Sequence, residues 1–470
     1  MTITHETIEK YRESIVHHTQ QLVRIKSVES EPRPGMPFGE GVHHALTYML
    51  NLAAEQGFET VNVDGYAGHA DYGAGEEILA VLVHLDVVPE GTGWDYPPYG
   101  AEIHEGQLYG RGIIDDKGPA VASLFAMKAL KDSGYDPGKK IRLIFGTDEE
   151  SGWKDLEVYF SRYPRPDTGF SPDAEFPLIH GEKGIQIFTM ETPWNQTDAK
   201  VTIISIQGGN APNMVPDYCE AVLKVVEGHK KAVSERLIQF IKNTGYDMGI
   251  EELPERLVIQ SKGISAHGSM PEKGQNAVSQ LMLFLNECPG LGDEAIAAVD
   301  VYSRHIGMEV NGQSIGCGLE DDISGKLIFN VGLISADVHQ LKLTVNTRYP
   351  ITAKGEAVLN GIRNSLVGSR YKLQLEEDIG PLFVSKEDEL VQKLMQVYRE
   401  ETGDTVSEPI TIGGGTYARA LAHGVAFGPL FPGQEELAHK KNESMAVDDL
   451  IRITRIYARA LQVLAGERSS

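Results

Sequence analysis

The chain of 470 residues has few cysteines, no long apolar run and a deficit of positive charge. Its three cysteines are widely spaced and odd in number, so they suit neither a disulfide framework nor a CxxC pair; we expect buried thiols and a cytoplasmic location. No apolar run approaches the roughly 18 residues that a membrane span needs, and the acidic start is not expected to be a signal peptide. The 43 Lys+Arg against 67 Asp+Glu give a net charge of −24, which disfavours nucleic acid and anionic membranes as partners because both are polyanions.

The composition, with 41% hydrophobic and 23% charged residues, is that of a folded protein. The length suggests two or three domains. Two short runs rich in branched residues, 78–83 and 141–145, predict buried strands of a largely parallel sheet. Residues 118–131 between them predict a crossover helix, and helical spacing recurs at 6–26 and 43–56. This alternation is typical of an α/β fold, with a mixed, largely parallel sheet flanked by helices.

The pattern of predicted strands and helices changes at about Gly184, and the α/β pattern returns after Gly380. Between these points strand-like runs at 186–191, 201–206, 218–226, 257–260, 328–333 and 341–346 alternate with helical runs at 229–243, 275–287 and 354–367. Helical patterns return at 385–402 and 447–465. We therefore predict a split domain, residues 1–185 and 382–470, into which an α+β domain, residues 186–381, is inserted.

Histidine and acidic side chains follow the predicted strands. His84 directly follows the first strand, with Asp86 two residues on; Asp115 precedes the crossover helix, and Glu149 and Glu150 follow the second strand. Ligands collect at the carboxyl ends of strands in open α/β sheets. Each group alone also has an ordinary explanation: a structural histidine, a helix cap or an acidic surface loop.

Asp173, in a turn, and His439, near the end of the chain, extend this set. Together the histidines and carboxylates suit Zn²⁺, with Mn²⁺ or Co²⁺ as possible substitutes. In a two-metal site a shared carboxylate and a bridging water supply the nucleophile. The paired Glu149 and Glu150 allow one acid to bind metal while its neighbour moves protons.

Seven segments occur in the order seen in the di-zinc exopeptidase family, which includes aminoacylases, carnosinases, succinyl-diaminopimelate desuccinylase and glutamate carboxypeptidases. They are HLDVVP, YGRGIIDDKGP, GTDEESG, SPDAEFP, GISAHGSMPEKGQNA, IGGGTYARA and HKKNE, and they span residues 84–443. The length, the double acid in DEES and the form GGGTYARA are most similar to the PepV-type dipeptidase branch.

The resemblance implies a catalytic domain that binds two zinc ions and an inserted lid domain. It implies that His84 and Asp173 are ligands of one ion, that Glu150 and His439 are ligands of the other, and that Asp115 bridges both. In the family the peptide bond that follows the bridging aspartate is cis.

The resemblance also implies catalytic roles. Glu149 resembles the general base that takes a proton from the metal-bridged water and passes it to the leaving amine. Asp86 resembles the residue that orients His84, and His267 resembles the lid histidine that donates a hydrogen bond to the oxyanion.

Substrate contacts are implied as well. Asn213 resembles a lid amide that contacts substrate, and Arg348 resembles the guanidinium that grips the C-terminal carboxylate. Gly413, Gly414 and Gly415 precede a helical run, so their N–H groups could hold that same carboxylate.

One departure from the branch lies next to His439. Lys440 and Lys441 stand where small neutral residues are expected. They put two positive charges near a cationic site unless their long stems carry the ammonium groups away.

These observations predict a metal-dependent dipeptidase that hydrolyses short peptides with a free C-terminal carboxylate. An N-acyl amino acid deacylase of the desuccinylase or deacetylase type is the alternative, because the residues on the amine side of the substrate lie in no readable motif. A non-catalytic metal- or peptide-binding protein is the alternative outside enzymology. We expect a monomer, since the long insertion resembles the form that completes its own site, with a dimer as the other possibility.

Overall fold

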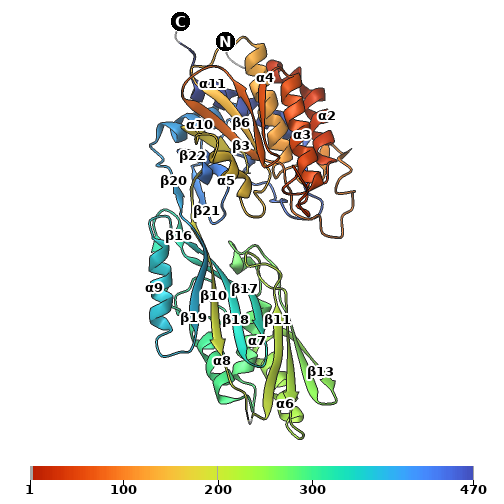
Figure 1. The fold of residues 1–470 in the computed structure, drawn as a ribbon, viewed down its shortest axis with the longest axis vertical. Helices are drawn as coiled ribbons and strands as arrows, with labels where there is room; N and C mark the ends of the chain where they lie inside the picture. Colours follow the sequence, from red (N-terminus) through yellow and green to blue (C-terminus); the bar gives the residue numbers. More distant parts are fainter. Residues whose placement is uncertain (1–3, 198, 469–470) are drawn as a thin grey trace. The chain divides into compact units, whose positions relative to one another are not determined.

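The computed structural model describes residues 4–197 and 199–468, and Figure 1 shows their fold. The chain divides into two compact units. The split unit comprises Met1–Gly181, Phe383–Ile410 and Gly415–Ser470, and the inserted unit comprises Glu182–Leu382 with Thr411–Gly414. Across the described ranges, no helix is long and apolar enough to cross a membrane.

The helices of the split unit are α1 (His5–Glu9), α2 (Arg12–Val23), α3 (Glu40–Glu55), α4 (Lys117–Asp132), α5 (Lys154–Phe160), the 3-10 helix η2 (Tyr417–Ala420), α10 (Glu389–Thr402) and α11 (Val447–Ala465). Its strands, some of which reach the boundary with the inserted unit, are β1 (Glu59–Val63), β2 (Ala67–Tyr72), β3 (Ile78–His84), β4 (Glu102–His104), β5 (Gln107–Tyr109), β6 (Lys140–Gly146), β7 (Thr168–Ser171), β8 (Ala174–Glu175), β9 (Ile179–Glu182), β20 (Leu382–Phe383), β21 (Ile410–Ile412), β22 (Gly424–Ala426), β23 (Pro429–Leu430) and β24 (Ser444–Ala446).

The main sheet of the split unit is mixed, in the order β1-β2-β6-β3-β7-β22-β9-β20, and its centre, β6-β3-β7-β22, is parallel. The sequence of strand β3 is continuously apolar because both of its faces are buried. Leu79, Val81 and Val83 pack into the core under α4 and α11, whereas Ala80 and Leu82 face the opposite way, toward α5 and η2. Both faces are therefore covered, which gives three layers with the strand ends free to carry a site.

Strand β7 lies against β3 at a point where no side chain fits, so the position is glycine. An ideal Cβ built on Gly169 would lie 2.2 Å from the carbonyl oxygen of Ala80. The close approach fixes β7 beside β3, so that His84, the last residue of β3, and Asp173, which follows β7, lie at the same edge of the sheet.

The inserted unit contains α6 (Lys230–Thr244), the 3-10 helix η1 (Pro271–Lys273), α7 (Ala277–Asn286), α8 (Asp293–His305) and α9 (Gly355–Ser365). Its strands are β10 (Gly184–Pro193), β11 (Val201–Gly208), β12 (Tyr218–Val225), β13 (Asp247–Leu253), β14 (Arg256–Lys262), β15 (Glu320–Asp321), β16 (Gly325–Lys326), β17 (Ile328–Ala336), β18 (Gln340–Tyr349) and β19 (Lys372–Ile379).

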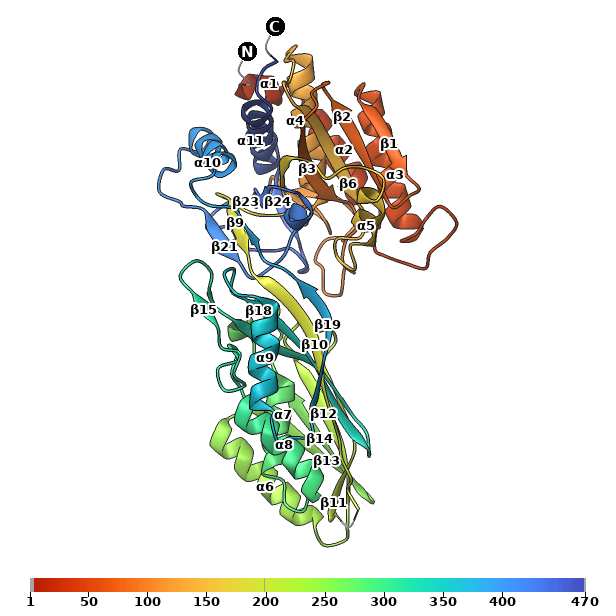
Figure 2. The ribbon, with the colours of Figure 1, turned by 60° about the vertical axis from the view of Figure 1, so that its left-hand side comes forward.

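The large sheet of the inserted unit is antiparallel, in the order β13-β14-β12-β11-β17-β18-β10-β19. Its helices lie on one face, as Figure 2 shows. On β18, Leu341, Leu343 and Val345 enter the core beneath these helices. The alternate residues, among them Asn346 and Arg348, face the other side, which is the pattern of a sheet with one apolar face.

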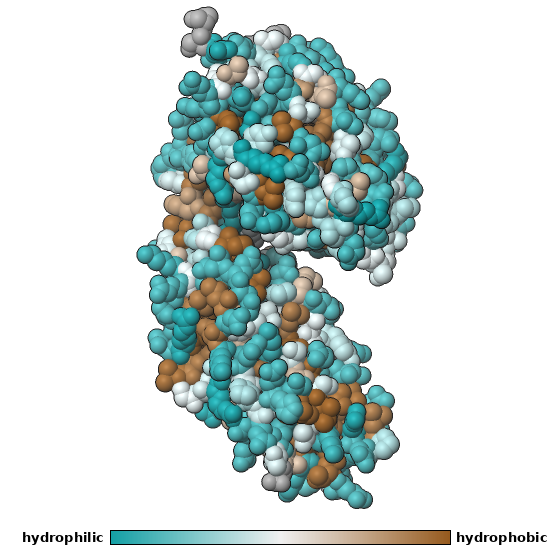
Figure 3. Space-filling view, viewed as in Figure 1, coloured by the Kyte–Doolittle hydropathy of each residue, from teal (hydrophilic) through white to brown (hydrophobic). Residues whose placement is uncertain are grey.

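The predicted fold class is confirmed: a mixed sheet with parallel strands and flanking helices, together with an α+β unit. The single helix predicted at 6–26 is wrong in detail, because α1 ends at Glu9 and α2 begins at Arg12. Strand β19 was not predicted, since most of its residues are exposed and its sequence, KLQLEEDI, is largely polar. The visible faces of both units are mainly hydrophilic, with scattered hydrophobic patches (Figure 3), as the net charge leads one to expect.

Candidate metal centre

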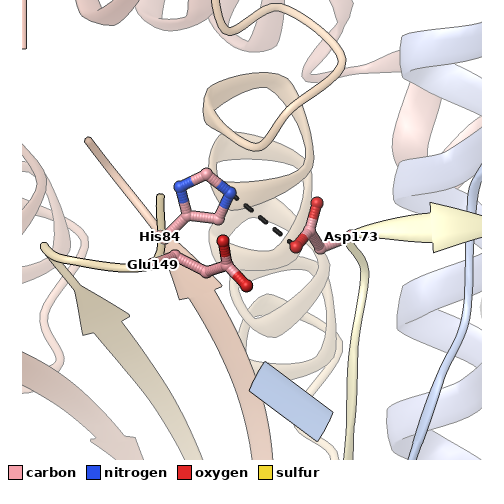
Figure 4. A group of neighbouring side chains, drawn as sticks. All are labelled: His84, Glu149 and Asp173. Atoms are coloured by element: carbon pink, nitrogen blue, oxygen red, sulfur yellow. Dashed lines mark ion pairs between the residues drawn. The ribbon is translucent and has the colours of Figure 1, made fainter. Parts of the chain in front are cut away.

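The ends of neighbouring strands bring the predicted site residues of the split unit together. His84 is the last residue of β3 and lies opposite Gly146, the last residue of β6, from which the chain runs on to Glu149. Asp173 follows β7. Figure 4 shows the side chains of His84, Glu149 and Asp173 converging from these three segments.

Asp115 lies between two imidazoles. Its Oδ1 is 2.8 Å from His84 Nε2, and its Oδ2 is 3.0 Å from His439 Nε2. His84 Nε2 is also 3.8 Å from Asp173 Oδ2, and His439 Nε2 is 3.0 Å from Glu150 Oε1. Each oxygen of one carboxylate therefore faces a separate histidine, and each histidine faces one further carboxylate.

Ligand atoms of these residues are close enough to share a cation. His84, Asp115 and Glu150 form one group with atoms within 4.8 Å of one another, and His84, Glu149 and Asp173 form a second. The second group includes Glu149, which the sequence predicts as a base and not as a ligand. Proximity alone does not separate these roles, because a base must also lie within reach of a water at the site.

Asp86 fixes two of the candidate ligands. Its backbone carbonyl oxygen lies 3.0 Å from His84 Nδ1 and its Oδ1 lies 3.5 Å from the same atom, while its Oδ2 accepts a hydrogen bond of 3.0 Å from the backbone N–H of Glu150. A carbonyl oxygen only accepts, so Nδ1 carries a proton and Nε2 is the nitrogen that faces the carboxylates. When the ring is neutral, Nε2 is therefore the nitrogen with the lone pair. This is the tautomer that a metal ligand requires.

Asp115 is joined to Asp116 by a cis peptide bond, as the resemblance implies. Asp116 is buried, and its Oδ2 accepts a hydrogen bond of 3.2 Å from the backbone N–H of His84. The second acid of the pair therefore holds the backbone of a candidate ligand, while the first faces the histidines.

The electrostatics of the site reflect crowded carboxylates. Burial and the nearby Asp115 charge raise the pKa of Asp173 to about 7, and burial together with Asp173 raises the pKa of Glu149 well above its usual range. Burial disfavours the imidazolium of His84, but the nearby carboxylates, with Asp115 first among them, outweigh burial and raise the pKa of His84 well above 6.5. The same balance, with Glu150 as the main partner, raises the pKa of His439.

The donor set fits a divalent cation. Within the described residues, His84 Nε2 is buried without a hydrogen-bond partner although it lies 2.8 Å from Asp115 Oδ1. Its direction thus suits a shared central ion and not a direct hydrogen bond. Imidazole nitrogen with carboxylate oxygen is a ligand combination typical of Zn²⁺ and also suitable for Mn²⁺ or Co²⁺.

The other predicted catalytic residue, His267, lies in the inserted unit, in a segment joined to that of Asn213. The backbone N–H of Gly268 donates to the carbonyl oxygen of Asn213 at 2.6 Å, and Asn330 donates from Nδ2 to the carbonyl oxygens of Pro212 and Met214 at 3.0 and 2.8 Å. Asn330 was missed from the sequence, because a lone strand asparagine carries no motif.

The proton position on His267 follows from Ser269. The backbone N–H of Ser269 lies 3.3 Å from His267 Nδ1, and the Ser269 hydroxyl oxygen lies 2.6 Å from the same atom. An N–H group can only donate, so Nδ1 accepts and the neutral ring carries its proton on Nε2.

The predicted substrate residues are placed as follows. Arg348 is buried on β18, with Nε donating to Asn346 Oδ1 at 2.9 Å. By their contacts Gly413 and Gly414 belong to the inserted unit and Gly415 to the split unit. The helical run predicted after them is a short 3-10 helix, Tyr417–Ala420.

The two lysines beside His439 have neighbours outside the candidate ligand set. Lys440 Nζ lies 3.8 Å from Glu435 Oε1 and its side chain is 54% exposed. The Lys441 side chain lies beside Gly93: a Cβ atom placed on Gly93 would be 3.9 Å from the Nζ atom of Lys441. The Lys440 charge is therefore partly balanced by an acid outside the candidate ligand set.

The chain is similar over most of its length to known proteins. The model of the peptidase family M20/M25/M40 matches residues 80–463. The chain is 41% identical over 469 residues to "Putative dipeptidase YtjP" of Bacillus subtilis, covering 98% of this chain and 99% of the relative. Human carnosine dipeptidase 1 has a similar fold, with TM-score 0.58, 16% identity and 98% of both chains covered. An M20 family metallo-carboxypeptidase from Sulfolobus solfataricus gives TM-score 0.57 at 16% identity, covering 96% of this chain and 98% of its own.

We predict that the carboxylate cluster makes the metal-free protein less stable as pH rises between about 4 and 7. Within this range Asp173, with its pKa raised from 3.8 to about 7, keeps a proton in the folded state that the unfolded chain has lost; stability falls with pH wherever the folded state binds more protons. Glu149 and Glu150, whose pKa values are also raised, act in the same direction, and the raised pKa values of His84 and His439 extend the loss of stability above pH 6.5.

Added Zn²⁺ should reverse this dependence, because the ion binds the deprotonated ligands and replaces their protons. Melting temperatures measured from pH 5 to 8, with a chelator and with excess Zn²⁺, should differ more at pH 7.5 than at pH 5. At 100 times the dissociation constant the expected stabilisation is about 2.7 kcal/mol. An equal shift at both pH values, or none, would contradict the prediction.

Proposed function

Because the chain belongs to the peptidase family M20/M25/M40, we propose that it is a metal-dependent dipeptidase acting on short peptides with a free C-terminal carboxylate. The observation that carries the proposal is Asp115, whose two oxygens each face a histidine while further carboxylates surround the pair. The name of the relative that is 41% identical over nearly both full lengths supports the dipeptidase assignment.

We propose that the site holds two divalent cations. His84 and Asp173 would bind one, Glu150 and His439 the other, and Asp115 both, with Zn²⁺ the expected metal and Mn²⁺ or Co²⁺ as alternatives. When bound, such ions polarise the scissile carbonyl group and lower the pKa of water at the site.

The proton transfers are assigned to Glu149. Its carboxylate would take a proton from the attacking water and then deliver it to the leaving nitrogen. Burial and the neighbouring Asp173 raise its pKa above the usual carboxyl range, which suits a group that must both accept and release a proton near neutral pH. Asp86 would keep His84 and Glu150 oriented through the contacts described above.

Residues of the inserted unit are assigned to the substrate. The Nε2–H of His267 would donate to the oxyanion that develops on the carbonyl oxygen, a contribution of several kcal/mol in general. Arg348 and the loop of Gly413, Gly414 and Gly415 would bind the terminal carboxylate, and Asn213 would contact the peptide. A requirement for that carboxylate limits the substrates to short peptides.

The remaining assignments concern the setting of the enzyme. A cytoplasmic location is proposed because all three cysteines are buried free thiols, as expected in a reducing compartment. A monomer is the expected state, which light scattering can measure.

We predict that Glu149→Gln lowers kcat by about 10²–10⁴-fold, the usual contribution of a general base, and leaves the bound metal content unchanged. The amide has nearly the same shape but cannot take the proton. Hydrolysis of dipeptides should be followed with Zn²⁺, Mn²⁺ or Co²⁺ added, together with metal analysis of the purified protein. The matched control is Glu157→Gln on α5, an exposed glutamate whose loss should leave kcat unchanged. A fully active Glu149→Gln enzyme would rule out this role.

The same assay decides the substrate class. Acetyl- and succinyl-amino acids should be tested beside the dipeptides at equal concentrations. Faster cleavage of the acylated compounds would replace the dipeptidase assignment with an amino acid deacylase. Binding of dipeptides by the metal-loaded protein without any cleavage would point to a non-catalytic protein.

We predict that Ser269→Ala lowers kcat by about 3–10-fold with little change in KM. The variant loses one hydrogen bond to His267 Nδ1, worth about 0.5–1.5 kcal/mol, and so weakens the preference for the donating tautomer. Nitrogen chemical shifts of the His267 ring should show more proton on Nδ1. Ser269→Thr should restore both values, and Ser265→Ala, at an exposed position of the same segment, should change neither. Unaltered ring shifts in Ser269→Ala would contradict the role.

A further inference from the structure

Glu443 is a fully buried carboxylate four residues after His439. Its Oε2 accepts a hydrogen bond of 2.7 Å from the Arg111 guanidinium, and both oxygens accept from backbone N–H groups of the segment that leads to Asp115. These N–H donors are Gly112 at 3.0 Å, Ile114 at 2.9 Å and Asp115 itself at 3.4 Å. One carboxylate thus accepts from one side chain and from three backbone N–H groups of the loop that carries a candidate metal ligand.

The chain around Glu443 is fastened to the same region by other bonds. Its carbonyl oxygen accepts from the Gly110 N–H at 2.9 Å, and β24, which follows it, pairs with β5, which precedes that loop. On the other side, Asn442 and Asp95 exchange two hydrogen bonds of 2.8 and 2.6 Å. His439 stands at the start of this anchored turn.

His439 and Asn442 both adopt left-handed backbone conformations, with φ of 63° and 60°. Such conformations are uncommon for residues other than glycine and persist where the surroundings fix them. The turn is therefore held in a particular shape, and the bonds of Glu443 and Asn442 are among the contacts that hold it.

We propose that Glu443, together with Arg111, is a positioning residue for the cation shared by Asp115, Glu150 and His439. Glu443 binds the loop that carries Asp115 and belongs to the turn that carries His439. It therefore sets the distance between Asp115 and His439. The inference rests on the two-ion site of the proposed function. It adds a residue that strengthens the binding of one of the two ions more than that of the other.

A buried ion pair also contributes to folding, so a general loss of stability must be separated from a local effect on the site. Arg111 and Glu443 are 2% and 0% exposed, and removing one partner leaves the other as an uncompensated buried charge. The split unit offers a matched pair elsewhere: Arg142 binds Asp71 through Nε and Nη2 at 2.8 and 2.7 Å, with exposures of 7% and 13%.

The test compares Glu443→Gln with Asp71→Asn in the full chain. Equilibrium dialysis against buffered Zn²⁺, with elemental analysis, gives the number of ions bound and the affinity of each, and the melting temperature reports folding. We expect Glu443→Gln to keep one ion at wild-type affinity and to bind the second about 10–100-fold more weakly, as for other partners of metal ligands. Asp71→Asn should lower the melting temperature while both ions keep their wild-type affinity.

A second variant keeps the inference testable if Glu443→Gln does not fold. Asp95→Ala is an exposed change that removes the hydrogen bond from Asn442 Nδ2 to the Asp95 carboxylate and keeps the one that the Asp95 backbone N–H donates. It should weaken the binding of the second ion by a few-fold without affecting the first.

The outcomes separate this inference from the proposed function. A wild-type protein that binds fewer than two ions would overturn the two-ion site itself. A wild-type protein that binds two, with variants that bind both at wild-type affinity or lose both equally, would overturn the role of Glu443 alone.

Discussion

The mutual repulsion of buried carboxylates is the constraint on which the rest of the split unit depends. Asp115, Glu149, Glu150 and Asp173 lie together at the ends of β3, β6 and β7, and burial favours their neutral forms. Ionised, they carry four negative charges, which two divalent cations would balance. Because −24 + 4 = −20, such ions would leave the protein still strongly acidic. The site therefore needs cations for a local reason that the overall charge does not reveal.

A second group of carboxylates holds this cluster in place. The Asp86 carboxylate binds the N–H of Glu150 while its backbone carbonyl oxygen binds His84, Asp116 binds the N–H of His84, and Glu443 binds the loop of Asp115. Backbone N–H groups cannot move independently of the chain, so these bonds fix the directions of the ligands more firmly than side-chain contacts alone would. Acidic side chains thus have two roles. Those that face other ligands are candidate metal ligands, and those that face the backbone hold the ligands in place.

The sheet of the inserted unit has one apolar face and one polar face. Its helices cover one side, and polar residues such as Asn330, Asn346 and Arg348 occupy the other. Asn330 holds the segment of Asn213, which in turn binds the segment of His267. A residue in the middle of a strand therefore supports two loops that are more than fifty residues apart in the sequence.

The sequence alone determined the family, the α/β character and the candidate ligands, because apolar strands followed by His84, Asp115 and Glu150 make a pattern that depends on local order and spacing. Tertiary structure decided what local order does not contain. The Asp86 carbonyl oxygen sets the tautomer of His84, Ser269 sets that of His267, and Glu443 joins two segments separated by more than three hundred residues. These contacts arise only when distant strands and loops pack together, since a hydrogen bond is specified by the position and direction of two atoms and not by the identity of either residue.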